Sequence, residues 1–203
     1  MKKNKISKDW INRQRRDIYV RKSKQEDFRS RAVYKLQEIN DKHKILKNNL
    51  SVIDLGAAPG SWSQYIIRKL KNCKLLSIDL KKMEPIGNSY QIVGDFKESS
   101  SKKKIINYFK NKVDLVISDM AVNTTGNKNL DSMVTGELSI EALNFSINTL
   151  KKQGCFVSKI FMGSSFNEIV NIAKKKFKEV NVYNPPASRK DSKESFIICR
   201  NLR

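Results

Sequence analysis

Carboxylates at the ends of apolar runs are the residues of this sequence that most clearly could do chemistry. Four aspartates close or directly follow such a run: Asp54, Asp79, Asp95 and Asp119. If the runs are buried parallel strands, all four acids lie on one rim of the sheet, where α/β folds bind nucleotides. Asp79 is expected to accept hydrogen bonds from ribose hydroxyls, and Asp95 from an adenine amino group. Each aspartate taken singly is also compatible with an ordinary turn at a strand end.

A glycine-rich turn follows the first of these runs. Val52, Ile53 and Leu55 are typical of a buried strand, and Gly56 to Gly60 allow a tight turn and a close backbone approach to a ligand. The dinucleotide fingerprint G-x-G-x-x-G fails, because Ala58 and Ser61 occupy its second and third glycine positions. A nicotinamide enzyme is therefore disfavoured. The run Asp-Leu-Gly-x-x-Pro-Gly suggests the loop of a class I S-adenosylmethionine (SAM) methyltransferase, with a plain strand-to-helix turn as the alternative.

Two lysines complete the set of candidate chemical groups. Lys159 stands in the apolar run Cys155–Phe161, and a lone buried ammonium is costly unless it is paired. We therefore expect Lys159 at the exit of a strand, beside an acid such as Asp119. Lys35 flanks an apolar helical face, from which it could reach either solvent or a cleft. Spacing alone does not choose between these two.

Strands and helices are expected to alternate along the chain and so to position these groups. Apolar runs and helical periodicity predict one doubly wound α/β domain without internal repeats. A polar loop is expected from Asn123 to Ser132, then a helix from about Glu137 to Lys151 with a glycine stop at Gly154. The expected strands are 52–55, 75–79, 91–95, 113–120, 155–161, one around 180–182, and 195–199; the other expected helices are 29–40, 62–71, one around 105–109, and 166–178.

The charge balance points to a polyanionic partner. With 41 Lys+Arg against 20 Asp+Glu, the 203-residue chain carries a formal net charge of +21, and nucleic acid leads the possible partners. A solvated lysine-rich surface is the alternative. Residues 1–28 are basic and contain Trp10, Tyr19 and Phe28, which suits an RNA-binding extension of a domain spanning 29–203, or a disordered tail.

The remaining composition restricts compartment and cofactor class. Cys73, Cys155 and Cys199 are scattered, and His43 is the single histidine, so neither a disulfide framework nor a zinc site is expected. The sequence has no apolar run long enough to span a bilayer and no signal-peptide pattern. We expect a soluble, cytoplasmic protein without membrane or metal.

Taken together, these segments resemble the FtsJ/RrmJ-type RNA 2′-O-ribose methyltransferases, and most closely those acting on large-subunit ribosomal RNA. The resemblance runs from about residue 10 to the C-terminus. The matching segments, in chain order, are Arg29-Ser30-Arg31-Ala32 with Lys35-Leu36, Asp54 to Gly60 with Trp62-Ser63-Gln64-Tyr65, Gly94-Asp95-Phe96, Ser118-Asp119-Met120-Ala121 with Asn123, Lys159, Gly163, and Ser188-Arg189 through Glu194.

The resemblance implies a fold, a cofactor and a set of site residues. It implies a seven-stranded sheet whose last strand is antiparallel, SAM as cofactor, and ribosomal RNA, within the large subunit or its precursor, as the partner of a monomer. The chain departs from the family's pattern at Ser61, for a usual glycine, and at Val122, for a usual proline. The implied catalytic residues are Lys35, Asp119, Lys159 and Glu194, and the implied cofactor contacts are Gly56, Gly60, Trp62, Asp79, Asp95 and Asp119.

Methyl transfer to a ribose hydroxyl requires alignment of three atoms and removal of a weakly acidic proton. Lys159 is the best candidate base, but an ordinary lysine, with a pKa of about 10.4, is charged at neutral pH. A charged Lys159 that steers the hydroxyl is therefore an equally open role. Other interpretations of the whole chain are a transfer RNA methyltransferase of the same family, a non-catalytic RNA-binding assembly factor, and a SAM enzyme acting on a small molecule or protein.

Overall fold

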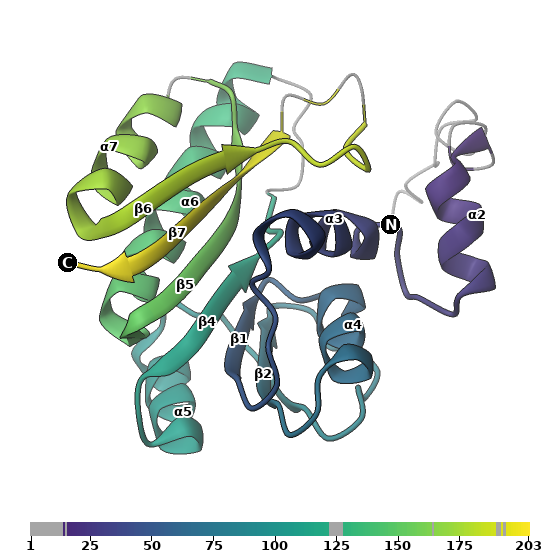
Figure 1. Ribbon diagram of the computed structural model, residues 1–203, viewed down its shortest axis with the longest axis horizontal. Helices are drawn as coiled ribbons and strands as arrows, with labels where there is room; N and C mark the ends of the chain where they lie inside the picture. Colours follow the sequence, from purple (N-terminus) through teal and green to yellow (C-terminus); the bar gives the residue numbers. More distant parts are fainter. Residues whose placement is uncertain (1–13, 15, 122–127, 164, 190–191, 193) are drawn as a thin grey trace, which may run out of the picture.

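The computed structural model has a central seven-stranded sheet with helices on both faces (Figure 1). It describes residues 14, 16–121, 128–163, 165–189, 192 and 194–203. The strand order is β3-β2-β1-β4-β5-β7-β6. The described strands are β1 (Ser51–Leu55), β2 (Lys74–Asp79), β3 (Tyr90–Val93), β4 (Val113–Ser118), β5 (Leu150–Phe161), β6 (Phe177–Tyr183) and β7 (Glu194–Leu202).

The strands pair in parallel except where β7 is involved. β7 runs antiparallel to both β5 and β6 and lies between them in the sheet. The predicted doubly wound α/β fold with an antiparallel last strand is therefore confirmed. Parallel pairing brings the carboxyl ends of β1, β2, β4 and β5 to one edge of the sheet.

Two hydrophobic layers hold the helices against the sheet. The helices of the described residues are α2 (Ile18–Gln25), α3 (Val33–His43), α4 (Ser61–Lys69), α5 (Ser99–Phe109), α6 (Lys128–Thr149) and α7 (Phe166–Lys176). Buried side chains of α3 and α4 pack on one face of the sheet, and those of α5, α6 and α7 pack on the other. Helix α2 stands beyond α3 and α4, at one end of the long axis of the molecule (Figure 1). No helix among the described residues is long and apolar enough to cross a membrane.

The segment around α6 differs from the prediction at both ends. The helix begins at Lys128, inside the predicted polar loop, and it continues through Gly136. A Cβ at Gly136 would collide with Ser165, so the glycine lets the start of α7 approach closely. This packing explains a glycine within the helix, which periodicity could not anticipate.

The predicted glycine stop at Gly154 is wrong, because α6 ends at Thr149 and β5 starts at Leu150. Leu150 pairs with Val113, but the next pair is Leu115 with Cys155, so an irregularity of the register takes up the residues between. A Cβ at Gly154 would lie 2.9 Å from the carbonyl oxygen of Lys151. The glycine thus serves a tight bulge at the start of the strand.

Candidate active site at the carboxyl edge of the sheet

The glycine turn after β1 lies at the carboxyl edge and leads directly into α4. Gly56 and Gly60 have φ values of 67° and 103°, in the left-handed region that favours glycine. A Cβ at Gly56 would collide with Met120, and one at Gly60 would lie 2.5 Å from Ile86 Cδ1. Both positions therefore require glycine, because the backbone conformation disfavours other residues and a Cβ would collide with a neighbour. The sequence predicted glycine here only from the expected tight turn.

The side chain of Arg29 holds this turn against a second loop. Its guanidinium donates to the carbonyl oxygen of Pro59 at 3.1 Å, to that of Glu84 at 2.8 Å and to that of Pro85 at 2.7 Å. One cation thus fixes three carbonyls from two segments that are distant in sequence. Sequence reasoning missed this role, because Arg29 was one of many basic residues near the N-terminus.

Asp79 and Asp95, two of the three acids predicted to contact the cofactor, lie at this edge. Asp79 ends β2, and its carboxylate accepts the backbone N–H of Ala58 at 2.9 Å and that of Lys81 at 2.8 Å. Asp95 comes two residues after the end of β3, and its carboxylate accepts the backbone N–H of Lys97 at 2.9 Å. Each carboxylate keeps acceptor capacity for a ligand, because a carboxylate has about four lone-pair sites.

The first turn of α4 turns its side chains inward. The indole of Trp62 is buried and donates to the carbonyl oxygen of Ala32 at 2.7 Å, and its ring packs against Phe196. The side chain of Ser61, one of the two departures from the family pattern, shares a hydrogen bond of 2.8 Å with Ser30. Trp62 therefore anchors the segment before α3 with its side chain, and only its main chain is available to a ligand. The other departure, Val122, and the matching Asn123 lie outside the described residues.

The sequence predicted that Asp54 lies on the rim with the other acids, but in the structure it does not. It is the penultimate residue of β1 and is 1% exposed, because its side chain turns under α4. Its carboxyl accepts the hydroxyl of Ser63 at 2.6 Å, and that hydroxyl also shares a hydrogen bond with Ser77. Burial raises the pKa of Asp54 to about 7, although the hydrogen bond from Ser63 opposes the shift. Asp54 is a buried support of the turn.

The four residues implied as catalytic come from four different segments and meet in one cluster. Lys159 Nζ lies 3.0 Å from Asp119 Oδ1, and it donates to the carbonyl oxygen of Asp119 at 2.8 Å. Lys35 Nζ lies 2.8 Å from Glu194 Oε1 and 3.7 Å from Asp119 Oδ1. The pairing of Lys159 with Asp119 that the sequence predicted is present. Lys35 points into this cluster and not to solvent, which settles the choice that its spacing left open.

The lysines and carboxylates of the cluster stabilise each other's charged forms. Burial alone would raise the pKa of Asp119, but the ammonium groups of Lys159 and Lys35 hold it below its usual value. Burial likewise opposes the charged form of Lys35, and the carboxylates of Asp119 and Glu194 overcome it and raise its pKa. Asp119 is therefore ionised and Lys35 is charged at neutral pH. Asp119 Oδ1 is the atom that faces both lysine ammonium groups.

Neighbouring residues that sequence reasoning missed hold the two lysines in place. The hydroxyl of Ser139 on α6 lies 2.8 Å from the carbonyl oxygen of Thr135 and 3.1 Å from that of Lys159, and it shares its one proton between them. The ring of Phe196 lies 5.7 Å from Lys35 Nζ, within cation–π range. Neither residue carries a sequence signal for this role, because a helix serine and a strand phenylalanine are ordinary core residues.

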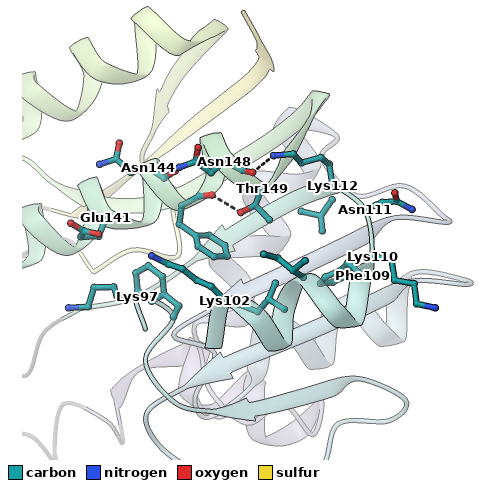
Figure 2. A pocket seen from close by; sticks show the side chains of 15 residues that line it. Lys97, Lys102, Phe109, Lys110, Asn111, Lys112, Glu141, Asn144, Asn148 and Thr149 are labelled. Atoms are coloured by element: carbon teal, nitrogen blue, oxygen red, sulfur yellow. Dashed lines mark hydrogen bonds between the residues drawn. The ribbon is translucent and has the colours of Figure 1, made fainter. Parts of the chain in front are cut away.

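A separate cavity of about 560 Å³ lies away from this cluster, between α5 and α6 (Figure 2). Its wall includes the apolar side chains of Ile105, Phe109 and Phe145, and Lys102 and Lys110 stand beside it. None of the residues implied as catalytic or cofactor-binding lines it. Among the described residues, no group of three or more His, Cys, Asp or Glu side chains could hold a metal ion.

Comparisons with known proteins agree with the fold and with the family that the sequence resembles. The family model described as "FtsJ-like methyltransferase" matches residues 28–202. The ribosomal RNA large subunit methyltransferase E of Pelagibacter ubique is 64% identical over 203 residues, covering 100% of both chains. The protein of the same name from Rickettsia bellii is 42% identical and covers 100% of this chain and 92% of its own.

Solved structures give the same picture. A putative ribosomal RNA methyltransferase from Plasmodium falciparum superposes with a TM-score of 0.78 and 32% identity, over 86% of this chain and 98% of that one. A putative methyltransferase from Streptococcus mutans, solved in complex with SAH, superposes with a TM-score of 0.52 and 15% identity, over 81% of this chain and 97% of that one. The second likeness concerns the fold alone.

Proposed function

The chain belongs to the FtsJ-like methyltransferase family, and from this we propose that it transfers a methyl group from SAM to a ribose 2′-hydroxyl of large-subunit ribosomal RNA. The observation that carries the proposal is the cluster in which Asp119 contacts both Lys159 and Lys35 while Lys35 contacts Glu194. The relatives named ribosomal RNA large subunit methyltransferase E, at 64% and 42% identity, support the choice of RNA. We further propose that the methylated nucleotide is a uridine, as the family resemblance implies.

The residues at the carboxyl edge fit SAM. The acceptors of Asp79 and Asp95 suit the hydroxyls of its ribose and the amino group of its adenine. The turn from Gly56 to Gly60 leads into the first turn of α4, whose N–H groups lack intrahelical partners and suit the methionine carboxylate. When bound, SAM supplies an electrophilic methyl group on a sulfonium.

We assign Lys159 to the ribose hydroxyl. Its Nζ is held by two contacts with Asp119, to the carboxylate and to the main-chain oxygen, which leaves one position of the nitrogen for the substrate. From there it either takes the hydroxyl proton or, as a cation, orients the hydroxyl and stabilises negative charge on its oxygen. Asp119 orients Lys159, while Lys35 and Glu194 hold the nucleotide beside it.

The +21 charge of the chain supports RNA over a small molecule or a protein as substrate. Residues 1–28 would supply part of the phosphate contacts, and catalysis would remain with residues 29–203. We propose that the protein acts as a monomer on the large subunit or its precursor, in the cytoplasm where ribosomes are assembled.

The test is transfer of labelled methyl from SAM to purified RNA. Large-subunit particles, free large-subunit RNA and transfer RNA are incubated separately with the protein, and the labelled RNA is digested with alkali. Label in an alkali-resistant dinucleotide is expected from large-subunit RNA, because a methylated 2′-hydroxyl cannot assist cleavage of its neighbouring linkage. Label in single nucleotides would indicate base methylation, and label only in transfer RNA would contradict the assigned substrate.

A further inference from the structure

The two carboxylate oxygens of Asp17 have separate partners. Asp17 is the N-cap of α2, and its Oδ1 accepts the backbone N–H of Tyr19 at 3.0 Å and that of Val20 at 3.3 Å. Its Oδ2 lies 2.5 Å from Arg31 Nη1 and 3.6 Å from Arg189 Nε. One oxygen therefore begins the helix, and the other joins two guanidinium groups from distant parts of the chain.

A second bridge connects the same two parts of the chain. Glu38 on α3 accepts the hydroxyl of Tyr19 at 3.3 Å with one oxygen and the backbone N–H of Ala187 at 2.7 Å with the other. Arg31 also donates to the carbonyl oxygen of Ala187. The start of α2 and the segment around Ala187 are thus both fastened to the part of the chain that carries Lys35.

The contacts made by Asp17 and Glu38 adjoin the catalytic cluster on two sides. Arg31 lies four residues before Lys35, just ahead of α3, and Arg189 lies five residues before Glu194, the first residue of β7. Lys35 and Glu194 meet at 2.8 Å. Arg31 and Arg189 thus stand close in sequence to the two charged groups that meet.

We propose that Asp17 is a positioning residue for methyl transfer, which holds Arg31 and Arg189 together so that Glu194 reaches Lys35. This inference rests on the proposed function. The side chains of Asp17 and Arg31 are only 11% and 15% exposed, so water screens their charges weakly. Burial lowers the pKa of Arg31, and the nearby charge of Arg189 lowers it further, whereas Asp17 opposes both. Without the carboxylate, the two guanidinium groups repel each other.

Asp17→Asn separates the two roles of the carboxylate. Asparagine is as good an N-cap as aspartate, so α2 keeps its start, but the negative charge facing Arg31 and Arg189 is removed. We expect kcat to fall by about 10- to 100-fold, since a misplacement of about 1 Å can cost about 10²-fold. The dissociation constant for SAM stays within twofold of wild type, because Asp79 and the glycine turn are untouched.

The matched control is Glu26→Gln, which removes an acid at the opposite end of α2, at its C-cap. Glu26 contacts Lys22 and accepts the hydroxyl of Tyr34, both outside the catalytic cluster. The substitution leaves kcat within twofold. Removing the second guanidinium tests the cause, because Arg189→Gln in the Asp17→Asn background relieves the repulsion and restores part of kcat. A merely structural defect would not be rescued in this way.

Hydrogen exchange provides a readout that does not depend on activity. The amide of Ala187 donates to Glu38 within the fastened segment, so Asp17→Asn should speed its exchange by about tenfold or more, and Glu26→Gln should not. If wild type transfers no methyl group, the proposed function fails, and this exchange still tests the fastening. An active Asp17→Asn variant with kcat within twofold of wild type, or unchanged exchange at Ala187, overturns the positioning role.

Discussion

Asp54→Asn should abolish a specific pH dependence of stability. Asp54 is 1% exposed and lies beneath the glycine turn, where it accepts the hydroxyl of Ser63. Asparagine has nearly the same shape, and its side-chain oxygen can still accept that hydroxyl. The substitution therefore removes the titration of the carboxyl while largely keeping the packing and the hydrogen bond.

The size of the effect follows from the pKa of Asp54 in the two states. It is 3.8 for an ordinary aspartate in the unfolded chain, and burial raises it to about 7 in the fold, with smaller contributions from the charges of Asp119 and Asp79. Between these pH values the folded state keeps a proton that the unfolded state has released, so the free energy of unfolding falls by about 1.36 kcal/mol per pH unit. This contribution to stability is complete below about pH 4 and is absent above about pH 7. From pH 5 to pH 8, wild type should lose roughly 3 kcal/mol relative to Asp54→Asn.

Urea denaturation of the two proteins at pH 5 and pH 8 measures this difference directly. Asp114→Asn is the control, because hydrogen bonds from Lys151 and Ser51 outweigh burial and keep the pKa of Asp114 below its usual value. Asp114 thus titrates below the measured range, and its difference from wild type should stay flat. A flat difference for Asp54→Asn as well would refute the reasoning, because Asp54 would then be ionised in the folded protein at pH 5.

Three further predictions concern the proposed site and the basic extension. Lys159→Met should lower kcat by about 10²-fold or more while leaving SAM affinity within twofold in calorimetry; Lys151→Met, which removes an exposed ion pair on the same strand, should change stability by at most about 1 kcal/mol and leave kcat unaltered. Asp79→Ala should weaken SAM binding about tenfold or more, because a hydrogen bond to a charged group contributes about 1.5–3 kcal/mol, and an unchanged calorimetric affinity would exclude a cofactor contact. Replacing the exposed Arg21 and Lys24 of α2 by glutamine should reduce the slope of log RNA affinity against log salt concentration by about 0.7 to 0.9 for each phosphate that these cations neutralise. The methylated position should stay unchanged. Equal slopes would show that α2 does not bind RNA.

The sequence predicted correctly where a buried charged group must have a partner of opposite charge. It failed for features that are determined by packing between segments. Lys159 was paired correctly with Asp119 because an ammonium in an apolar strand needs an acid at its exit. Asp54 was predicted on the rim and is not there, because the residue pattern of a short buried strand does not reveal whether the side chain of its acid faces inward. The early start of α6 and the bulge at Gly154 were missed, because both depend on packing against distant segments.

The basic extension shows a different kind of limit. Its charge was visible in the sequence and suggested RNA binding, which stays a prediction. The role of Asp17 was hidden, because Arg31 and Arg189 lie far apart in the chain and neither spacing nor composition brings them together. Removing residues 1–28 would therefore also remove this carboxylate, so a truncation would confuse RNA affinity with the geometry of the catalytic cluster.

The place of β7 in the sheet affects when the enzyme can first work during its biosynthesis. β7 follows β6 in the chain, yet it lies between β5 and β6, so a growing chain made only as far as Tyr183 has no strand on which β6 can dock. The edge of β5 stays open at that stage, and Glu194, the first residue of β7, is not yet present to meet Lys35. Closing the sheet and completing the cluster are therefore one late event, and under the proposed function a nascent chain lacks the complete set of catalytic groups until synthesis passes this strand.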